Sequence, residues 1–147
     1  MGTDLYLLGM QKTSAYTEVS PEIKARFKEI IIEKELKEIE FLIIGSDELK
    51  VPVSIKKATP LEYYLSDNSD VIIVVNEAMV DMFDDELKSL VIDEVMTSVS
   101  YNLEKEQLDF KKPTLNSYMG ILKKYKLDTY EKLEESIKSA KESLKIK

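Results

Sequence analysis

Four polar side chains near the middle of the chain are the candidates for metal chemistry. They lie in the segment Asp85–Asn102, whose apolar residues recur at helical spacing, and they are Asp93, Glu94, Thr97 and Ser98. A helix turns by about 100° per residue, so Asp93 and Glu94 diverge and cannot easily share one ion. Glu94 and Ser98 share a face, but one carboxylate and one hydroxyl suit a weakly held hard cation better than zinc.

Composition excludes the commonest nucleophilic and zinc sites. The 147 residues include no histidine and no cysteine, which excludes a Ser-His-Asp triad, a thiolate nucleophile, a disulfide and an imidazole or thiolate zinc ligand. The four glycines follow no phosphate-loop pattern. The pair Asp84-Asp85 could serve acid–base catalysis, but a cap at the start of the predicted helix explains it more simply. We therefore expect no cofactor and no bound metal.

The charge of the chain bears on the kind of partner. A formal net charge of -7 repels a nucleic-acid backbone, and the basic cluster Lys123, Lys124 and Lys126 is small enough to be a solvated helix end. No stretch approaches the roughly 18–20 apolar residues that span a bilayer. Met1–Gln11 lacks the basic start and the cleavage site of a signal peptide. We expect a cytoplasmic protein whose partner is another protein, with no direct contact to nucleic acid or membrane.

Three strands are predicted in the first half of the chain. Five consecutive β-branched residues, Val71–Val75, indicate a strand that is buried on both faces. Ile39–Ile44 is similar and ends in turn residues. Val51–Ala58 is predicted to be an edge strand, because Pro52 cannot donate to a ladder. We expect these strands to form a small antiparallel sheet.

Helices are predicted before and after these strands. Ser20-Pro21 is a helix start, and the first helix is expected to end near Leu36-Lys37. The segment Thr59-Pro60-Leu61-Glu62 is predicted to be a short helical turn. Later helices are expected at Asp85–Asn102, Pro113–Tyr125 and Asp128–Leu144. Asn76–Phe83 is expected to be a connection, and Asn102–Lys112 a charged loop. The order predicts an α+β fold with an N-terminal helix, a three-stranded sheet, a central helix and two further C-terminal helices. We divide the chain into an N-terminal extension (1–19), a domain (20–127) and a C-terminal helix (128–147).

Two sets of apolar side chains are candidates for a protein-binding surface. The first is the pair Tyr63 and Tyr64 in the short helical turn. The second is a stripe at helical spacing on the last helix, which includes Tyr130, Leu133, Ile137 and Leu144. Packing on the same domain is the commoner use of such a stripe, and binding of a partner helix is the alternative.

Several segments, from about Pro21 to Leu127, together resemble the phage metallopeptidases, a family with a zincin-like fold. They are the opening helix ending near Glu33-Lys34, the strand IEFLII, the segment VPVSIKKATPLEYYL, the strand DVIIVV, the helix LKSLVIDEVM and a final segment similar to a proline–histidine–aspartate motif with an aromatic helix. The resemblance implies a zinc held by two histidines four residues apart and by a third from a later segment. It also implies a glutamate that acts as general base.

The ligand positions of this family carry other residues here. In the register that keeps Asp93 in place, Glu94 replaces the first histidine and Ser98 the second. In a register shifted by one residue, Asp93 and Thr97 replace the histidines and Glu94 stands at the base. The third histidine falls at or beside Thr114.

The resemblance therefore implies a degenerate, catalytically inactive metallopeptidase-like domain, encoded by a phage and present in the host cytoplasm. Such a domain would act by binding a host or viral protein, which could be part of a nucleic-acid machine. Two alternatives stay open at this point. One is a hydrolase that uses a hard metal with Asp93 and Glu94, and the other is an assembly protein that binds through its C-terminal helix.

Overall fold

The computed structural model describes residues 16–110, 125 and 127–145. In this part of the chain, five helices and two sheets form an α+β fold, as the sequence predicts. The helices are α2 (Pro21–Glu33), α3 (Pro60–Leu65), α4 (Glu77–Val80), α5 (Asp85–Met96) and α7 (Leu127–Leu144). The strands are β1 (Thr17–Glu18), β2 (Phe41–Gly45), β3 (Val53–Lys57), β4 (Val71–Val75), β5 (Val99–Asn102) and β6 (Gln107–Phe110).

The main sheet is mixed and has the strand order β1-β2-β4-β3. Strand β4 pairs in parallel with β2, where Phe41 lies opposite Val71, and antiparallel with β3. The predicted antiparallel sheet of three strands is therefore wrong in two respects, because β2 and β4 run parallel and β1 adds a fourth strand. Parallel pairing needs a long crossover, and β3 and α3 supply it between β2 and β4.

Strand β1 lies within the segment that the sequence assigned to an N-terminal extension. It pairs antiparallel with β2, with Thr17 opposite Gly45. Gly45 permits this close approach, because a Cβ atom there would lie 2.7 Å from Thr17 Oγ1. Val19, directly after β1, is buried in the main core. Residues 17–19 are therefore part of the domain in this structure.

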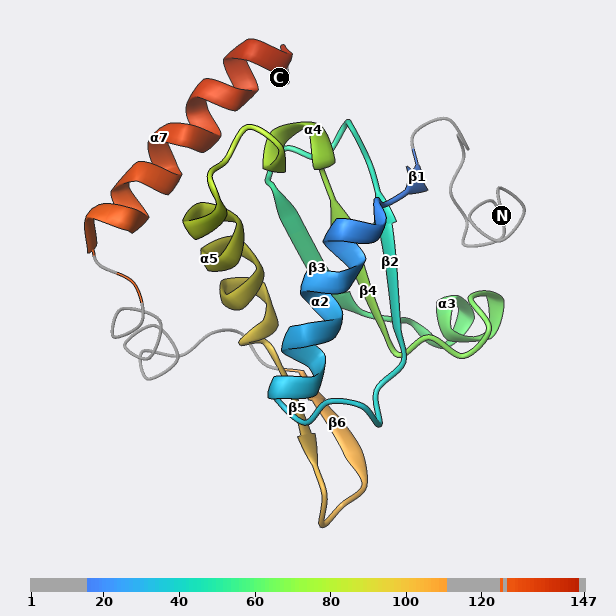
Figure 1. The fold of residues 1–147 in the computed structure, drawn as a ribbon. Coiled ribbons are helices and arrows are strands. Elements are labelled where there is room, and N and C mark those ends of the chain that lie inside the picture. The colour runs from blue at the N-terminus through green and yellow to red at the C-terminus, as the bar shows by residue number, and fades with distance from the viewer. Residues whose placement is uncertain (1–15, 111–124, 126, 146–147) are drawn as a thin grey trace.

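Helices α2 and α5 cover one face of the main sheet, and α7 packs against α4 and α5 (Figure 1). On β4, Val71, Ile73 and Val75 belong to the core beneath these helices, whereas Ile72 and Val74 lie on the opposite face. Burial of β4 on both faces confirms the prediction for this strand. Strand β3 is at the edge of the sheet, as predicted.

The helices that cover the sheet start at the predicted caps. The Ser20 side chain accepts a hydrogen bond from the N–H of Ile23. The Asp84 Oδ1 atom accepts one from the N–H of Leu87 at 2.9 Å. At α3, Thr59 and Glu62 form a reciprocal capping box. These local interactions satisfy N–H groups that a helix start otherwise leaves without a partner.

The central helix is shorter than predicted, because α5 ends at Met96 rather than at Asn102. The Thr97 hydroxyl donates to the Glu94 carbonyl at 2.6 Å and occupies an acceptor of the last turn. Beyond it, β5 and β6 form an antiparallel hairpin, so the predicted charged loop at 102–112 is largely a turn and a strand. Val99 fits both a helical stripe and a period-two alternation, which is why the pattern failed to locate the helix end.

At the C-terminal end, α7 matches the last predicted helix. The predicted helix at 113–125 lies outside the described residues apart from Tyr125, which is in a bend before α7. Among the helices of the described ranges, none combines the length and the apolar character needed to cross a membrane.

Candidate functional site

Asp93 lies near the C-terminal end of α5 and is buried against Tyr125. Asp93 is 6% exposed, and the Tyr125 hydroxyl donates to its Oδ2 atom at 2.6 Å. This distance is typical of an O–H group that donates to a carboxylate. Burial and the neighbouring Asp93 raise the pKa of Tyr125 above its ordinary value, so the hydroxyl remains a donor. Asp93 is thus engaged by the residue that leads into the C-terminal helix.

Glu94, the next residue of α5, is half-buried and interacts with Tyr130 in the first turns of α7. Burial raises the pKa of Glu94 above the ordinary range of a glutamate, and a side-chain hydrogen bond with Tyr130 partly opposes this rise. The two carboxyl groups of the candidate site therefore meet two tyrosines, Tyr125 and Tyr130. These contacts between carboxyl groups and tyrosine hydroxyls join α5 to the C-terminal segment.

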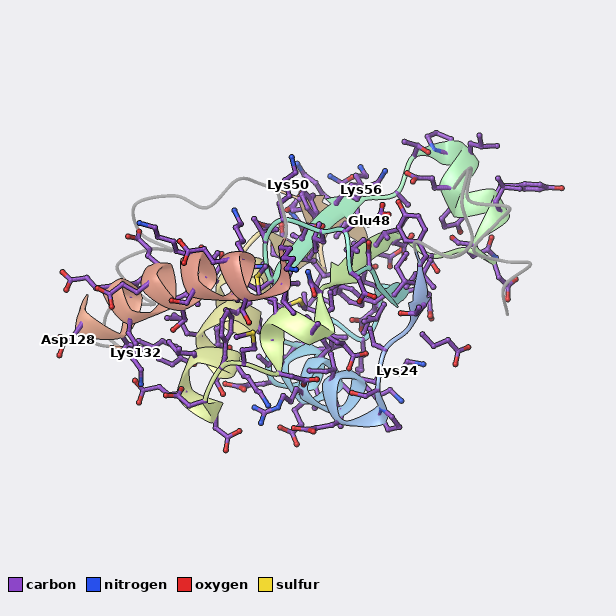
Figure 2. The ribbon with its side chains drawn as sticks, turned by 90° about the horizontal axis from the view of Figure 1, so that it is seen from above. Lys24, Glu48, Lys50, Lys56, Asp128 and Lys132 are labelled. Atoms are coloured by element: carbon purple, nitrogen blue, oxygen red, sulfur yellow. The ribbon has the colours of Figure 1, made fainter. Side chains whose placement is uncertain are left out.

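Two further side-chain hydrogen bonds connect α7 to the start of α5. The Thr129 hydroxyl donates to Glu86 Oε1 at 2.7 Å. Lys132 Nζ donates to Asp84 Oδ2 at 2.7 Å, and Figure 2 shows Lys132 on the side of α7. The hydrogen bond with Lys132 lowers the pKa of Asp84. The α7 segment is therefore held both at the start of α5 and at its end.

Thr97, Ser98 and Thr114 are the other residues that the sequence assigned to the candidate site. Thr97 is the C-cap of α5, and Ser98 is buried just beyond the helix. Thr114 lies outside the described residues. In the ranges that the structure describes, no group of three or more histidine, cysteine, aspartate or glutamate residues is placed to hold a metal ion. The geometry found here is that of carboxylates in internal hydrogen bonds.

The apolar stripe of the C-terminal helix is turned toward its own domain. Leu133 is 5% exposed and belongs to the main core. Tyr130, Ile137 and Leu144 are half-buried and pack against the same core. In the structure, the stripe therefore packs on its own domain, which is the commoner of the two expected uses, and it is not a free surface.

Tyr63 and Tyr64 lie on the surface instead. They are 42% and 79% exposed, and α3, which carries them, has no buried residue. An ion pair of 2.8 Å between Lys56 Nζ and Glu62 Oε2 ties α3 to the end of β3. A hollow of about 460 Å³ lies between β3, α3 and β6, and Tyr63 lines it.

Asn76 positions the loop before β3, a role that was not predicted from the sequence. Asn76 is fully buried, its Nδ2 donates to the Leu49 carbonyl at 2.9 Å, and its Oδ1 accepts from the N–H of Met79 at 3.1 Å. The pattern that could have revealed it is an asparagine directly after a buried strand, a favoured N-cap position.

Comparisons of the chain with models of known protein families, with curated proteins and with solved structures find no match. The resemblance to phage metallopeptidases rests on the quoted segments and stays a prediction.

Replacement of Glu94 by glutamine is expected to stabilise the protein at neutral pH by up to about 1 kcal/mol, a small effect because solvent screens a half-exposed carboxylate. The folded state raises the pKa of Glu94, so stability from this group is complete below the ordinary glutamate pKa and is lost as pH rises through the raised value. The gain from Glu94→Gln should therefore be present at pH 7 and absent near pH 3.

Urea denaturation at both pH values measures this difference. Glu135→Gln, at an exposed position of α7, is the control and should change little at either pH. A Glu94→Gln protein that is less stable than wild type at pH 7 would contradict the destabilising role of the charge.

Proposed function

We propose that the protein is a catalytically inactive, zincin-like domain that acts by binding another protein. The contacts of α5 support the inactive part of this proposal, because Asp93 and Glu94 are used to hold the C-terminal segment. The binding part rests on the outer edge of β3, with which no strand of the described residues pairs. This edge offers backbone groups that an extended segment of a partner can pair with.

The pairing of β3 with β4 fixes which backbone groups point outward. The N–H of Asn76 donates to the Pro52 carbonyl, and the N–H of Ala58 donates to the Asp70 carbonyl, both at 2.9 Å. In an antiparallel ladder the hydrogen-bonded pairs recur at every second residue. Ser54 and Lys56 therefore also face β4. The N–H and C=O groups of the alternate residues, Val53, Ile55 and Lys57, face away from it.

Within the described part of the chain, no strand pairs with this second edge of β3. An edge of this kind is a template for another strand, and many peptide-binding domains use it in this way. Lys57, at the end of β3, opposes registers that place the Lys57 of a second copy opposite it, because like charges across a ladder repel. Figure 2 shows Lys50 and Lys56 on the β3 side of the molecule, remote from Asp128 and Lys132 of α7. The edge therefore favours a different protein as its partner.

The test of strand addition compares two substitutions at Ile55. Proline at this position removes an outward N–H without touching the ladder to β4, which edge strands tolerate. Ile55→Pro should weaken binding at least tenfold, whereas Ile55→Ala, which removes the same side chain and keeps the N–H, should retain it. The probe is an array of synthetic twelve-residue peptides of random sequence, and titration calorimetry measures the affinity of the peptides that bind.

Two results would overturn the proposal. Equal binding by Ile55→Pro and wild type, with both proteins folded by circular dichroism, would exclude the β3 edge as the binding surface. One tightly held zinc ion per chain in the purified protein, found by elemental analysis, would contradict the inactive zincin-like part of the proposal.

A further inference from the structure

A hollow lies at the end of β3, the strand whose outer edge is the proposed binding surface. It measures about 460 Å³ and opens between β3, α3 and β6. Its walls include Pro60, Tyr63 and Leu108, which are apolar or aromatic, and Gln107, which is polar and exposed. Lys57, the last residue of β3, belongs both to this hollow and to the row of outward backbone groups.

Among the lysines that the structure describes around the hollow, Lys57 is the one without an ion pair. Lys56 is already paired with Glu62 at 2.8 Å. Asp70, the acidic residue of the lining, accepts a hydrogen bond from the N–H of Glu40 at 2.9 Å through Oδ2. Lys57 is exposed and has no ion pair with another residue of the described ranges.

We propose that the segment bound along β3 places an acidic side chain in this hollow, against the Lys57 ammonium group. The inference rests on the proposed function, because it requires a strand paired with β3. Residues directly opposite each other on neighbouring strands have side chains on the same face, with Cβ atoms about 5 Å apart. The residue opposite Lys57 is therefore within reach of its ammonium group, and opposite charges stabilise such a pair.

The rest of the site favours a carboxylate on a protein segment over a nucleic-acid phosphate. A chain with a net charge of -7 repels a polyanion, whereas a single carboxylate on an extended peptide meets mainly the local field of Lys57. Tyr63 and Leu108 offer apolar surface to the stem of a glutamate side chain. The partner is thus an extended segment with an acidic residue at one fixed position.

The same peptide array tests this inference with the full chain and three variants. Wild type should select peptides with aspartate or glutamate at one position, and glutamine in place of that residue should weaken binding about tenfold. Lys57→Gln should lose the preference, and Lys57→Glu should select lysine or arginine at the same position. Lys28→Glu, at an exposed position of α2, makes the same change in net charge and should keep the acidic preference.

The outcomes separate this inference from the proposed function. Peptides that bind wild type and lose affinity to Ile55→Pro, but show no acidic preference, would overturn the inference and leave strand addition in place. An acidic preference that persists in Lys57→Glu would do the same. An array without any bound peptide would overturn the proposed function, and the inference with it.

Discussion

Replacement of Asn76 by alanine is expected to lower the free energy of unfolding by about 3 kcal/mol, the largest effect predicted for a polar residue of this protein. Asn76 is fully buried and serves two segments at once. Its Oδ1 caps α4 through the N–H of Met79, and its Nδ2 binds the Leu49 carbonyl in the loop before β3. Loss of an N-cap costs about 1 kcal/mol, and a buried polar group left without its partner costs about 1–3 kcal/mol.

Urea denaturation followed by circular dichroism measures this loss. Asn76→Ser is the matched variant, because serine keeps an acceptor for the cap but is too short to replace the donor to Leu49. It should recover about 1 kcal/mol of the loss. If alanine and serine variants were both as stable as wild type, Asn76 would not hold the loop before β3.

Replacement of Tyr125 by phenylalanine is expected to cost about 1.5–3 kcal/mol, the usual range for a hydrogen bond to a charged group. The hydroxyl donates to Asp93 at 2.6 Å, and both residues are buried at the contact of α5 with the C-terminal segment. The change removes one oxygen atom and leaves the ring in place, so the effect reports on the hydrogen bond rather than on packing.

A double-mutant cycle separates this bond from the other contacts of the two residues. Tyr125→Phe, Asp93→Ala and the combined variant should give a coupling free energy of about 1–2 kcal/mol by urea denaturation. Tyr64→Phe is the control, because Tyr64 is 79% exposed and its hydroxyl should contribute little. A coupling energy near zero would show that Asp93 does not hold the C-terminal segment through Tyr125.

Local features of this fold were predictable from the sequence, because short-range chemistry determines them. Ser20 and Asp84 cap their helices as expected, and Thr59 caps the helix at the predicted short turn, since each side chain bonds to a backbone N–H three residues later. The predicted edge position of β3 is confirmed, although Pro52 precedes the strand and its carbonyl faces β4, so its missing N–H does not explain the outer edge. The burial of Val71–Val75 also follows from its composition.

Features that depend on distant residues were not predictable in the same way. Nothing in the pattern of β2 or β4 states the direction in which they pair, because the path of the intervening chain decides it. The end of α5 depends on the hairpin partner of β5, since Val99 fits a helix or a strand equally well. The contact of Asp93 with Tyr125 joins residues 32 positions apart, so the spacing of the carboxylates alone could not show that Asp93 accepts a hydrogen bond from a tyrosine.

The parallel pairing of β2 with β4 affects the route by which the chain folds. When β2 pairs with β4, the chain between them, which contains β3 and α3, becomes a closed loop. The conformational entropy of this loop is lost before any contact compensates for it. Strand β3 has β4 as its partner in the sheet, so β3 also cannot pair before β4 is present. During synthesis on a ribosome, β2 and β3 therefore emerge without this partner and remain so until β4 has also left the ribosome. Aggregation or capture by a chaperone competes with folding in that interval.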